Sequence, residues 1–455
     1  MTDVRENKMG TMPVNRLLLS MAAPMILSML VQAAYNVVDS IFVARVSENA
    51  LTALSLAFPL QSLMIAVATG TGVGINAMLS KSLGEKNTKS VNAAAGNGVF
   101  LALCSYLVFL IFGIFGSRMF FEAQKVDPQI VEFGTSYLTI CLTASIGIFM
   151  QITFERLLQA TGKTFITMWT QLSGAIINLI LDPILIFGLL GAPKMGVAGA
   201  ALATVIGQCV AAAVAIICNF KFNSEVKLTL SGLRPRAAVI GRIYGVGVPS
   251  ILMAAIGSVM TYVMNQILLS FENIGETAVA VFGVYFKLQS FIFMPIFGLN
   301  NGMVPIVAYN YGARRRKRIT ATIRLSVIYA VSMMFIGFVI FQLFSGTLLG
   351  FFDASEEMMN LGIPALRTIS LHFLLAGFCI ISSSVFQALG NGIFSLIISV
   401  ARQLLVLLPV AYLLSLTGEV SAVWWSFIIA EFVSLVLCSI FLKVIYSKKL
   451  KDIPA

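Results

Sequence analysis

The chain has 455 residues, and 58% of them are hydrophobic while only 11% are charged. A soluble domain does not need so much apolar surface, so the composition excludes an ordinary soluble enzyme and predicts a membrane protein. The formal net charge of +11 is explained by basic loops that face anionic lipid, and we expect the bilayer rather than nucleic acid as a partner.

Long apolar segments follow one another along the whole chain, separated by short polar loops. Roughly 20 apolar residues are enough for one helix to cross a bilayer, so these segments predict an all-α integral membrane protein with twelve transmembrane helices. The expected spans are residues 15–44, 52–79, 92–117, 133–160, 165–190, 196–219, 238–270, 276–309, 319–349, 362–389, 393–416 and 421–446.

The pattern of the first half recurs in the second half. The segment GTGVGINAMLSKSLG aligns with GLNNGMVPIVAYNYG, so that Gly70 meets Gly298 and Gly74 meets Gly302 at an offset of 228 residues (298 minus 70). The same offset aligns the QATG and QALG segments that end the fourth and tenth spans. Duplicated halves of this kind are typical of secondary transporters and predict two six-helix lobes, residues 1–225 and 226–455. Close helix packing explains the paired glycines better than a phosphate-binding loop does.

Basic residues are concentrated in alternate loops, which is typical of the cytoplasmic face of a membrane protein. Lys81 and Lys86 follow the second span and Arg314–Arg318 follows the eighth, whereas acidic residues such as Glu356 lie in the loops between. The pattern predicts a multi-pass protein of the plasma (inner) membrane with both termini in the cytoplasm. Six spans per half bring both halves into the membrane from the same side, so the repeat is parallel.

Acidic residues inside the predicted spans are the first candidates for function, because charge in hydrocarbon is costly. Asp39 follows Tyr35 by four residues and Asp182 follows Asn178 by four, so each carboxylate shares a helical face with a neutral polar side chain. Two carboxylates brought together at low dielectric cannot both stay ionised, so the pair predicts binding of a proton or of a cation such as Na⁺. The alternative is that each acid only hydrogen-bonds a neighbouring helix.

Other charged residues within the spans have both a structural and a functional interpretation. Glu155 precedes Arg156, so a local ion pair is as reasonable as a role in coupling. Glu431 lacks an acidic partner in its half, and its charge is expected to be balanced by Arg402 or Lys287. Each of these two cations either extends toward the membrane surface or takes part in gating, substrate binding or pairing between the lobes.

Five segments together resemble the multidrug and toxic compound extrusion (MATE) transporters, with features of the bacterial MepA-like and DinF-like branches. They are YNVVDSIFVA, GTGVGINAMLSKSLG, LLQATGKT, NLILDPILIFG and GVAGAALATVIG, and the resemblance extends from about Arg16 to Tyr446. It implies two six-helix lobes that form a V around a central cavity.

The resemblance also implies roles for particular residues of the first lobe. The family's acid and tyrosine of span one match Asp39 and Tyr35, and its Asn-x-x-x-Asp pair of span five matches Asn178 and Asp182. A threonine of span six belongs to the same cluster, and Thr204 is the matching residue. Span one is expected to change shape around a hinge at Pro24 when the cation binds. Spans seven, eight and ten have no acid in their interiors, so we expect cation coupling to rest on the first lobe.

The function implied is an antiporter, not an enzyme, that exports amphipathic and often cationic drugs by alternating access. We expect a monomer without cofactors, coupled to H⁺ or Na⁺. One alternative is a lipid-linked sugar flippase of the same superfamily, which should have more cations in its central cavity. A different class is an intramembrane enzyme, whose D-D-x-x-D, H-E-x-x-H and G-x-S-x-G motifs are absent from the sequence.

Overall fold

The computed structural model describes residues 6–352 and 354–454, and its regular elements within those residues are all helical. Ten helices are long and apolar enough to cross a membrane, and the number rises to twelve when each of two bent helix pairs is taken as one span. The predicted fold class is therefore confirmed. The first half contains α1 (Lys8–Thr11), α2 (Val14–Ala44), α3 (Glu48–Gly84), α4 (Thr88–Phe115), α5 (Ser117–Glu122), α6 (Pro128–Thr143), α7 (Ile146–Ala160), α8 (Thr164–Phe187), η1 (Leu189–Gly191) and α9 (Val197–Phe222).

The second half repeats this order after the short helix η2 (Leu230–Leu233). Its elements are α10 (Ala237–Leu269), α11 (Gly275–Gly312), α12 (Arg316–Gly350), α13 (Glu356–Ser370), α14 (Phe373–Ala388), α15 (Gly392–Val400), η3 (Ala401–Leu407), α16 (Leu408–Ser415), α17 (Val420–Val423), α18 (Trp425–Ile445) and η4 (Tyr446–Leu450).

The fourth span of each half is bent at matching places. Helices α6 and α7 meet at 43°, and α13 and α14 meet at 49°. The two breaks are separated by 227 residues (370 minus 143), which is within one residue of the offset between the glycine segments. The two halves thus share backbone shape as well as sequence pattern, and the break in the fourth span of each half is part of the repeat.

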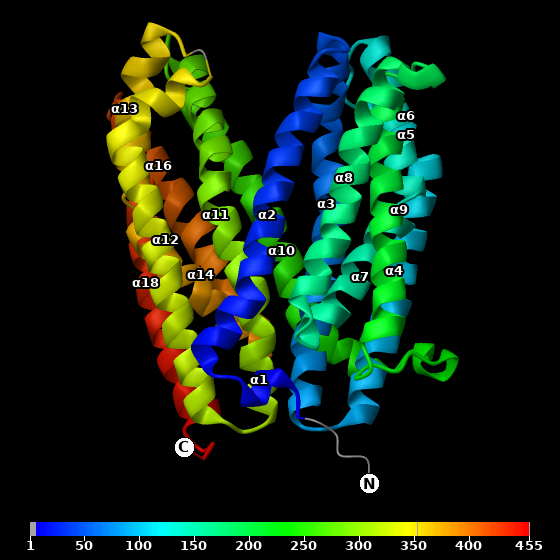
Figure 1. Ribbon diagram of the computed structural model, residues 1–455. Coiled ribbons are helices and arrows are strands. Elements are labelled where there is room, and N and C mark those ends of the chain that lie inside the picture. Colours follow the sequence, from blue (N-terminus) through cyan, green and yellow to red (C-terminus); the bar gives the residue numbers. More distant parts are fainter. Residues whose placement is uncertain (1–5, 353, 455) are drawn as a thin grey trace.

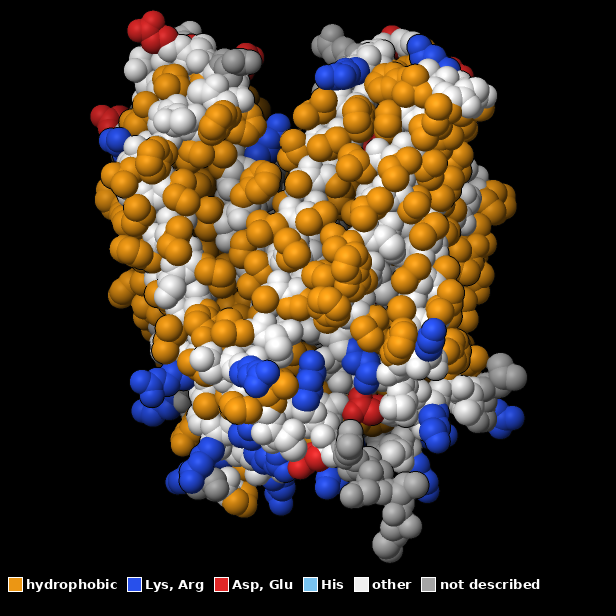
Figure 2. Space-filling view, in the orientation of Figure 1, with side chains coloured by type: hydrophobic (Ala, Val, Ile, Leu, Met, Phe, Trp, Pro, Cys, Tyr) orange, Lys and Arg blue, Asp and Glu red, His pale blue; other side chains and the backbone are white. Residues whose placement is uncertain are grey.

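The helices form two bundles that diverge toward one end, as the V-shaped arrangement in Figure 1 shows. The short helix α1 and the C-terminal end of α18 lie at the other end, where most of the visible Lys and Arg side chains also gather (Figure 2). The intervening surface is covered by hydrophobic side chains, and a notch separates the lobes at the end away from α1 (Figure 2). This distribution suits a protein whose apolar belt contacts lipid and whose central cavity opens on one side of the membrane.

The repeated glycines lie where each lobe meets the first helix of the other half. A Cβ atom at Gly298 or Gly302 of α11 would lie 2.6 to 2.7 Å from the backbone nitrogens of Ile26 and Ala22 in α2. A Cβ atom added at Gly74 of α3 would likewise lie too close to the backbone of α10. Small residues allow such close backbone approach, so the packing role expected for these glycines is confirmed.

The predicted hinge residue Pro24 lies inside α2, between the two residues that contact α11. Helix α2 also packs against α8 of its own lobe, and α10 packs against both α3 and α15. In Figure 1, α2 and α10 accordingly run between the two bundles. Each of these two helices therefore links both lobes.

Candidate cation and substrate sites

The first-lobe residues singled out by the sequence come together between α2, α8 and α9. The Asn178 amide lies 3.3 Å from a carboxylate oxygen of Asp182 and 3.3 Å from the Thr204 hydroxyl. Asp182 is 1% exposed, and its carboxyl group is a near neighbour of that of Asp39 across the α2–α8 contact. Two neighbouring carboxylates repel each other when both are ionised, so this arrangement is suited to holding a proton or another small cation.

The carboxyl pair retains capacity for a further ligand. The Oδ1 atom of Asp39 is buried and has no hydrogen-bond partner among the described residues. An adjacent cavity of about 170 Å³ is lined by Tyr35, Asn178 and Thr204. The two aspartates thus lie beside a polar cavity inside the first lobe, which a small cation can occupy.

Glu155 lies deeper in the same lobe and is surrounded by neutral donors. It is 3% exposed and accepts hydrogen bonds from Gln151 at 3.0 Å, Thr170 at 3.2 Å and Gln171 at 2.8 Å. Gln171 in turn accepts a hydrogen bond from Ser28 of α2. The network therefore connects spans one, four and five without a cationic partner within 4.0 Å of Glu155 among the described residues.

Arg156 points away from this network and reaches the second lobe. Its Nη1 atom donates to the side-chain oxygen of Gln159 at 2.7 Å and to that of Asn301 in α11 at 2.9 Å. Glu155 and Arg156 are adjacent on α7 but contact different parts of the molecule, because successive helical side chains point in different directions. The local ion pair that was one interpretation of Glu155 and Arg156 is not formed.

The second lobe neutralises its intramembrane acid with a cation. Arg402 Nη1 lies 3.3 Å from Glu431 Oε2, and the two side chains are 29% and 4% exposed. Arg402 is part of η3, a π-helical segment in which the wider backbone turn interrupts span eleven. Lys287, the other candidate partner, instead lies 5.8 Å from the ring centroid of Phe352. Among the described residues, Glu431 is therefore paired with Arg402 and not with Lys287.

Two adjoining cavities lie between the lobes. The one nearer the basic end is about 610 Å³ and is lined by helices of both halves, with Arg156 on one wall and Arg402 on the other. The second is about 680 Å³, and its lining residues include aromatic side chains such as Tyr285 and Phe427 as well as Glu431. Arg402 lines both cavities, and Arg156 lines the first one and also the small cavity inside the first lobe. The small cavity of the first lobe and the 610 Å³ cavity, the central cavity, are thus separated by the side chains that line both, which are Met29, Gln32, Thr69 and Arg156.

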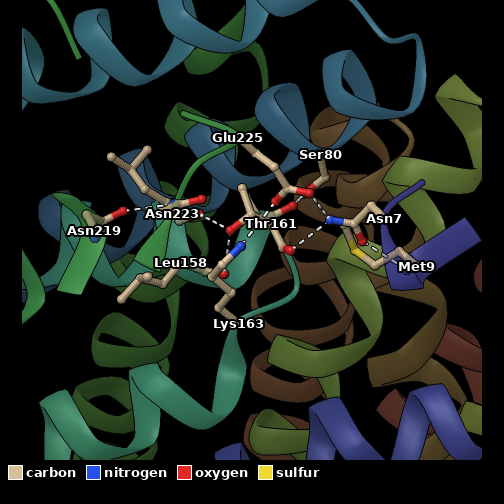
Figure 3. Close-up of polar contacts among 11 residues, drawn as sticks. Asn7, Met9, Ser80, Leu158, Thr161, Lys163, Asn219, Asn223 and Glu225 are labelled. Carbon is tan, nitrogen blue, oxygen red and sulfur yellow. Dashed lines mark hydrogen bonds and ion pairs between the residues drawn. The ribbon is translucent and has the colours of Figure 1, made fainter. Parts of the chain in front are cut away.

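The basic end is closed by the N-terminal segment. Asn7 donates to the Thr161 carbonyl at 3.0 Å and to Glu225 at 2.6 Å, and Lys163 pairs with Glu225 at 3.3 Å (Figure 3). On the other side, the carbonyl of Met9 accepts hydrogen bonds from two second-lobe side chains. The donors are Asn310 and Arg318, each at 3.0 Å. Helix α1 therefore ties both lobes together at the end opposite the notch.

Sequence reasoning missed several members of these networks. Gln151 lies four residues before Glu155, a spacing that could have identified it as a partner. Gln171 and Ser28 lie on other helices and had no local signal. Asn301 is one residue before Gly302 in the repeated segment, and its link to Arg156 depends on how the lobes meet.

Comparison with known proteins identifies the family. The chain is 28% identical to the multidrug export protein MepA of Staphylococcus haemolyticus (strain JCSC1435) over 417 residues, which covers 90% of this chain and 88% of that protein. It is 26% identical to MepA of Staphylococcus aureus (strain MSSA476) over 422 residues, 92% of this chain and 91% of that one. Its fold matches that of a multidrug resistance MATE family transporter in an outward-facing conformation, with a TM-score of 0.92, 24% identity and coverage of 98% of this chain and 99% of that chain. The family model MatE matches residues 24–184 and 249–413, one stretch in each half, and the chain therefore belongs to the MatE family of transporters.

Proposed function

We propose that this protein is a cation-coupled antiporter that exports amphipathic organic compounds, drugs among them, by alternating access. The observation that carries the proposal is the pair of neighbouring carboxyl groups of Asp39 and Asp182, which lie beside a cavity within the first lobe. Such a pair binds a cation only when the site is accessible, and its charge then changes the contacts between α2 and α8. The multidrug export activity in the names of the staphylococcal relatives supports the substrate class.

A proton is the first candidate for the coupling ion, because one proton shared by two neighbouring carboxyl groups removes the repulsion between them. Na⁺ is the second candidate, because Asn178 and Thr204 carry neutral oxygen atoms and line the cavity beside the aspartates. Both ions would act in the same way, by replacing repulsion between the carboxylates with attraction. Helix α2 would pass the change to the second lobe, since it contacts both α8 and α11.

The basic end of the molecule is expected to face the cytoplasm, with the protein in the bacterial plasma membrane. In this orientation the cavity opens outward, and α1 closes the inner side. Export then requires the α1 contacts to open as the outer notch closes. We expect a single chain to be sufficient for transport, because each half contributes to the central cavity.

Gradient-driven transport in proteoliposomes tests this proposal. Asp39→Asn and Asp182→Asn should each reduce gradient-driven drug transport at least about tenfold, since an amide cannot exchange a proton at neutral pH. Imposing a pH gradient and a Na⁺ gradient separately identifies the ion. Near-normal transport by either well-folded variant would contradict the proposal, and Glu122→Gln in the outer loop is a matched control for loss of one acid.

A further inference from the structure

The central cavity is lined by positively charged side chains, and the proposed cation site at Asp39 and Asp182 gives them no role. The cavity of about 610 Å³ is lined by Arg156 and Arg402, and none of its described lining residues is Asp or Glu. The nearest acids line other cavities. Glu155 accepts a hydrogen bond from Gln171 and lines the small cavity of the first lobe, whereas Glu431 is paired with Arg402 and lines the adjoining cavity of about 680 Å³. Positive groups are therefore presented to the cavity from both lobes.

Arg156 is the more available of the two cations. Arg402 already has a carboxylate partner at 3.3 Å, whereas the hydrogen bonds of Arg156 go to the neutral amides of Gln159 and Asn301. All of these bonds leave from Nη1, so within the described residues Nε and Nη2 have no acceptor. A guanidinium with free donors is well suited to a planar acidic group, which can accept two parallel hydrogen bonds.

A second, independent feature of the cavity also points to a ligand. Asn300, which is 8% exposed, lines the cavity, and its Oδ1 atom has no hydrogen-bond partner among the described residues. Ser434 lines the same cavity and its hydroxyl is likewise buried without a partner. Buried polar atoms normally find partners, so these atoms indicate hydrogen-bonding groups on a bound molecule. Met29, Met253, Met294 and Phe297 supply apolar and polarizable walls for the rest of it.

We propose that the central cavity binds an amphipathic organic anion whose carboxylate, sulfonate or phosphate group is held by Arg156. This inference rests on the proposed export function and changes only the charge of the expected substrate, because the resemblance implied organic cations. A cation in the same cavity would meet two guanidinium groups, and none of the described residues that line this cavity is an acid.

Fluorescence titration of the full-length protein in lipid nanodiscs, without any gradient, tests the proposal. The probes are dansylglycine, which carries a carboxylate, and dansylcadaverine, which carries an ammonium on the same fluorophore. We expect wild type to bind dansylglycine more tightly than dansylcadaverine. Arg156→Gln should weaken dansylglycine binding at least about tenfold and change dansylcadaverine binding less than about twofold. Arg156→Lys should retain part of the anion affinity, and Arg118→Gln is the charge-matched control because its side chain is 76% exposed on the outer loop.

The possible outcomes distinguish anion binding by Arg156 from a purely structural role of Arg156, and both of these from a failure of cation-coupled transport. If Arg156 only ties α7 to α11, Arg156→Gln and Asn301→Ala will weaken both probes equally, and the proposal is wrong. It is also wrong if wild type prefers dansylcadaverine. Displacement of dansylglycine from nanodiscs that contain phosphatidylglycerol would identify a lipid headgroup as the source of the anion, and no displacement would identify a soluble acid. Failure of the antiport proposal appears only in gradient-driven transport and leaves these titrations unchanged.

Discussion

At the scale of single residues, the intramembrane acids have two kinds of partner. Asp182 and Glu155 are contacted by neutral amides and hydroxyls, which stabilise a carboxyl group without fixing its charge. Glu431 is paired with Arg402, so its charge is already balanced. A group with neutral partners can gain or lose a cation, whereas an ion-paired group resists protonation. The chemistry of the partner, rather than burial alone, therefore distinguishes the two lobes.

Glu431→Gln is expected to affect stability more than coupling. The substitution leaves Arg402 without its counterion and should lower the free energy of unfolding by about 1 to 3 kcal/mol, less than for a fully buried pair because Arg402 is 29% exposed. Thermal unfolding in detergent measures this loss, and the double variant Arg402→Gln/Glu431→Gln should recover most of it. Cation-driven export should fall less than for Asp39→Asn or Asp182→Asn. A larger transport loss at Glu431 than at both aspartates would move the coupling site to the second lobe.

At the scale of helices, the duplication explains how the two lobes are joined. The glycines of α3 and α11 each pack against the first helix of the other half, so the same kind of close helix contact occurs in both lobes. These contacts bring backbones close together near the basic end, while the lobes diverge at the other end (Figure 1). A residue with a side chain at these positions would separate the lobes where they need to meet.

Valine substitutions within α11 test this account. Gly302→Val would place a Cβ atom 2.7 Å from the backbone nitrogen of Ala22, so we expect it to lower the free energy of unfolding by about 1 to 3 kcal/mol or more. Gly283→Val is the matched control, because a Cβ atom there has no neighbour within 4 Å among the described residues. Thermal melts of the two variants in the same detergent measure the difference. Equal melting temperatures would show that the glycine contact does not hold the lobes together.

At the scale of the whole molecule, opening at one end is accompanied by closure at the other. The α1 segment bridges Thr161 and Glu225 of the first lobe to Asn310 and Arg318 of the second. The proposed alternating access would need these contacts to break, and their strength would then contribute to the balance between outward-open and inward-open states.

Weakening the α1 contacts should therefore shift this balance. Asn7→Ala combined with Glu225→Gln removes the 2.6 Å hydrogen bond and the ion pair to Lys163, and we expect the inward-open population to rise about tenfold. Distances between spin labels at Lys86 and Lys317 would report the separation of the lobes at this end. Glu122→Gln, which removes an ion pair at the other end, is the control. An unchanged distance distribution would exclude α1 as a closing element.

Orientation in the membrane is a prediction of the charge pattern. In a variant without its native cysteines, a cysteine introduced at Lys317 should be protected from impermeant thiol reagents in intact cells, and one introduced at Glu356 should be labelled. Labelling of the first and protection of the second would reverse the proposed orientation and the direction of transport.

The sequence alone determined the twelve spans, the duplication and the identity of the intramembrane acids, because hydropathy and repeat spacing are properties of local sequence. It also indicated Asn178 as the neighbour of Asp182, since residues four apart share a helical face. Only the tertiary structure decided that Glu155 is surrounded by neutral donors from other helices and that Arg156 crosses to Asn301. Those contacts depend on how each helix is rotated and which helices are adjacent, and both are set by close packing across the whole molecule.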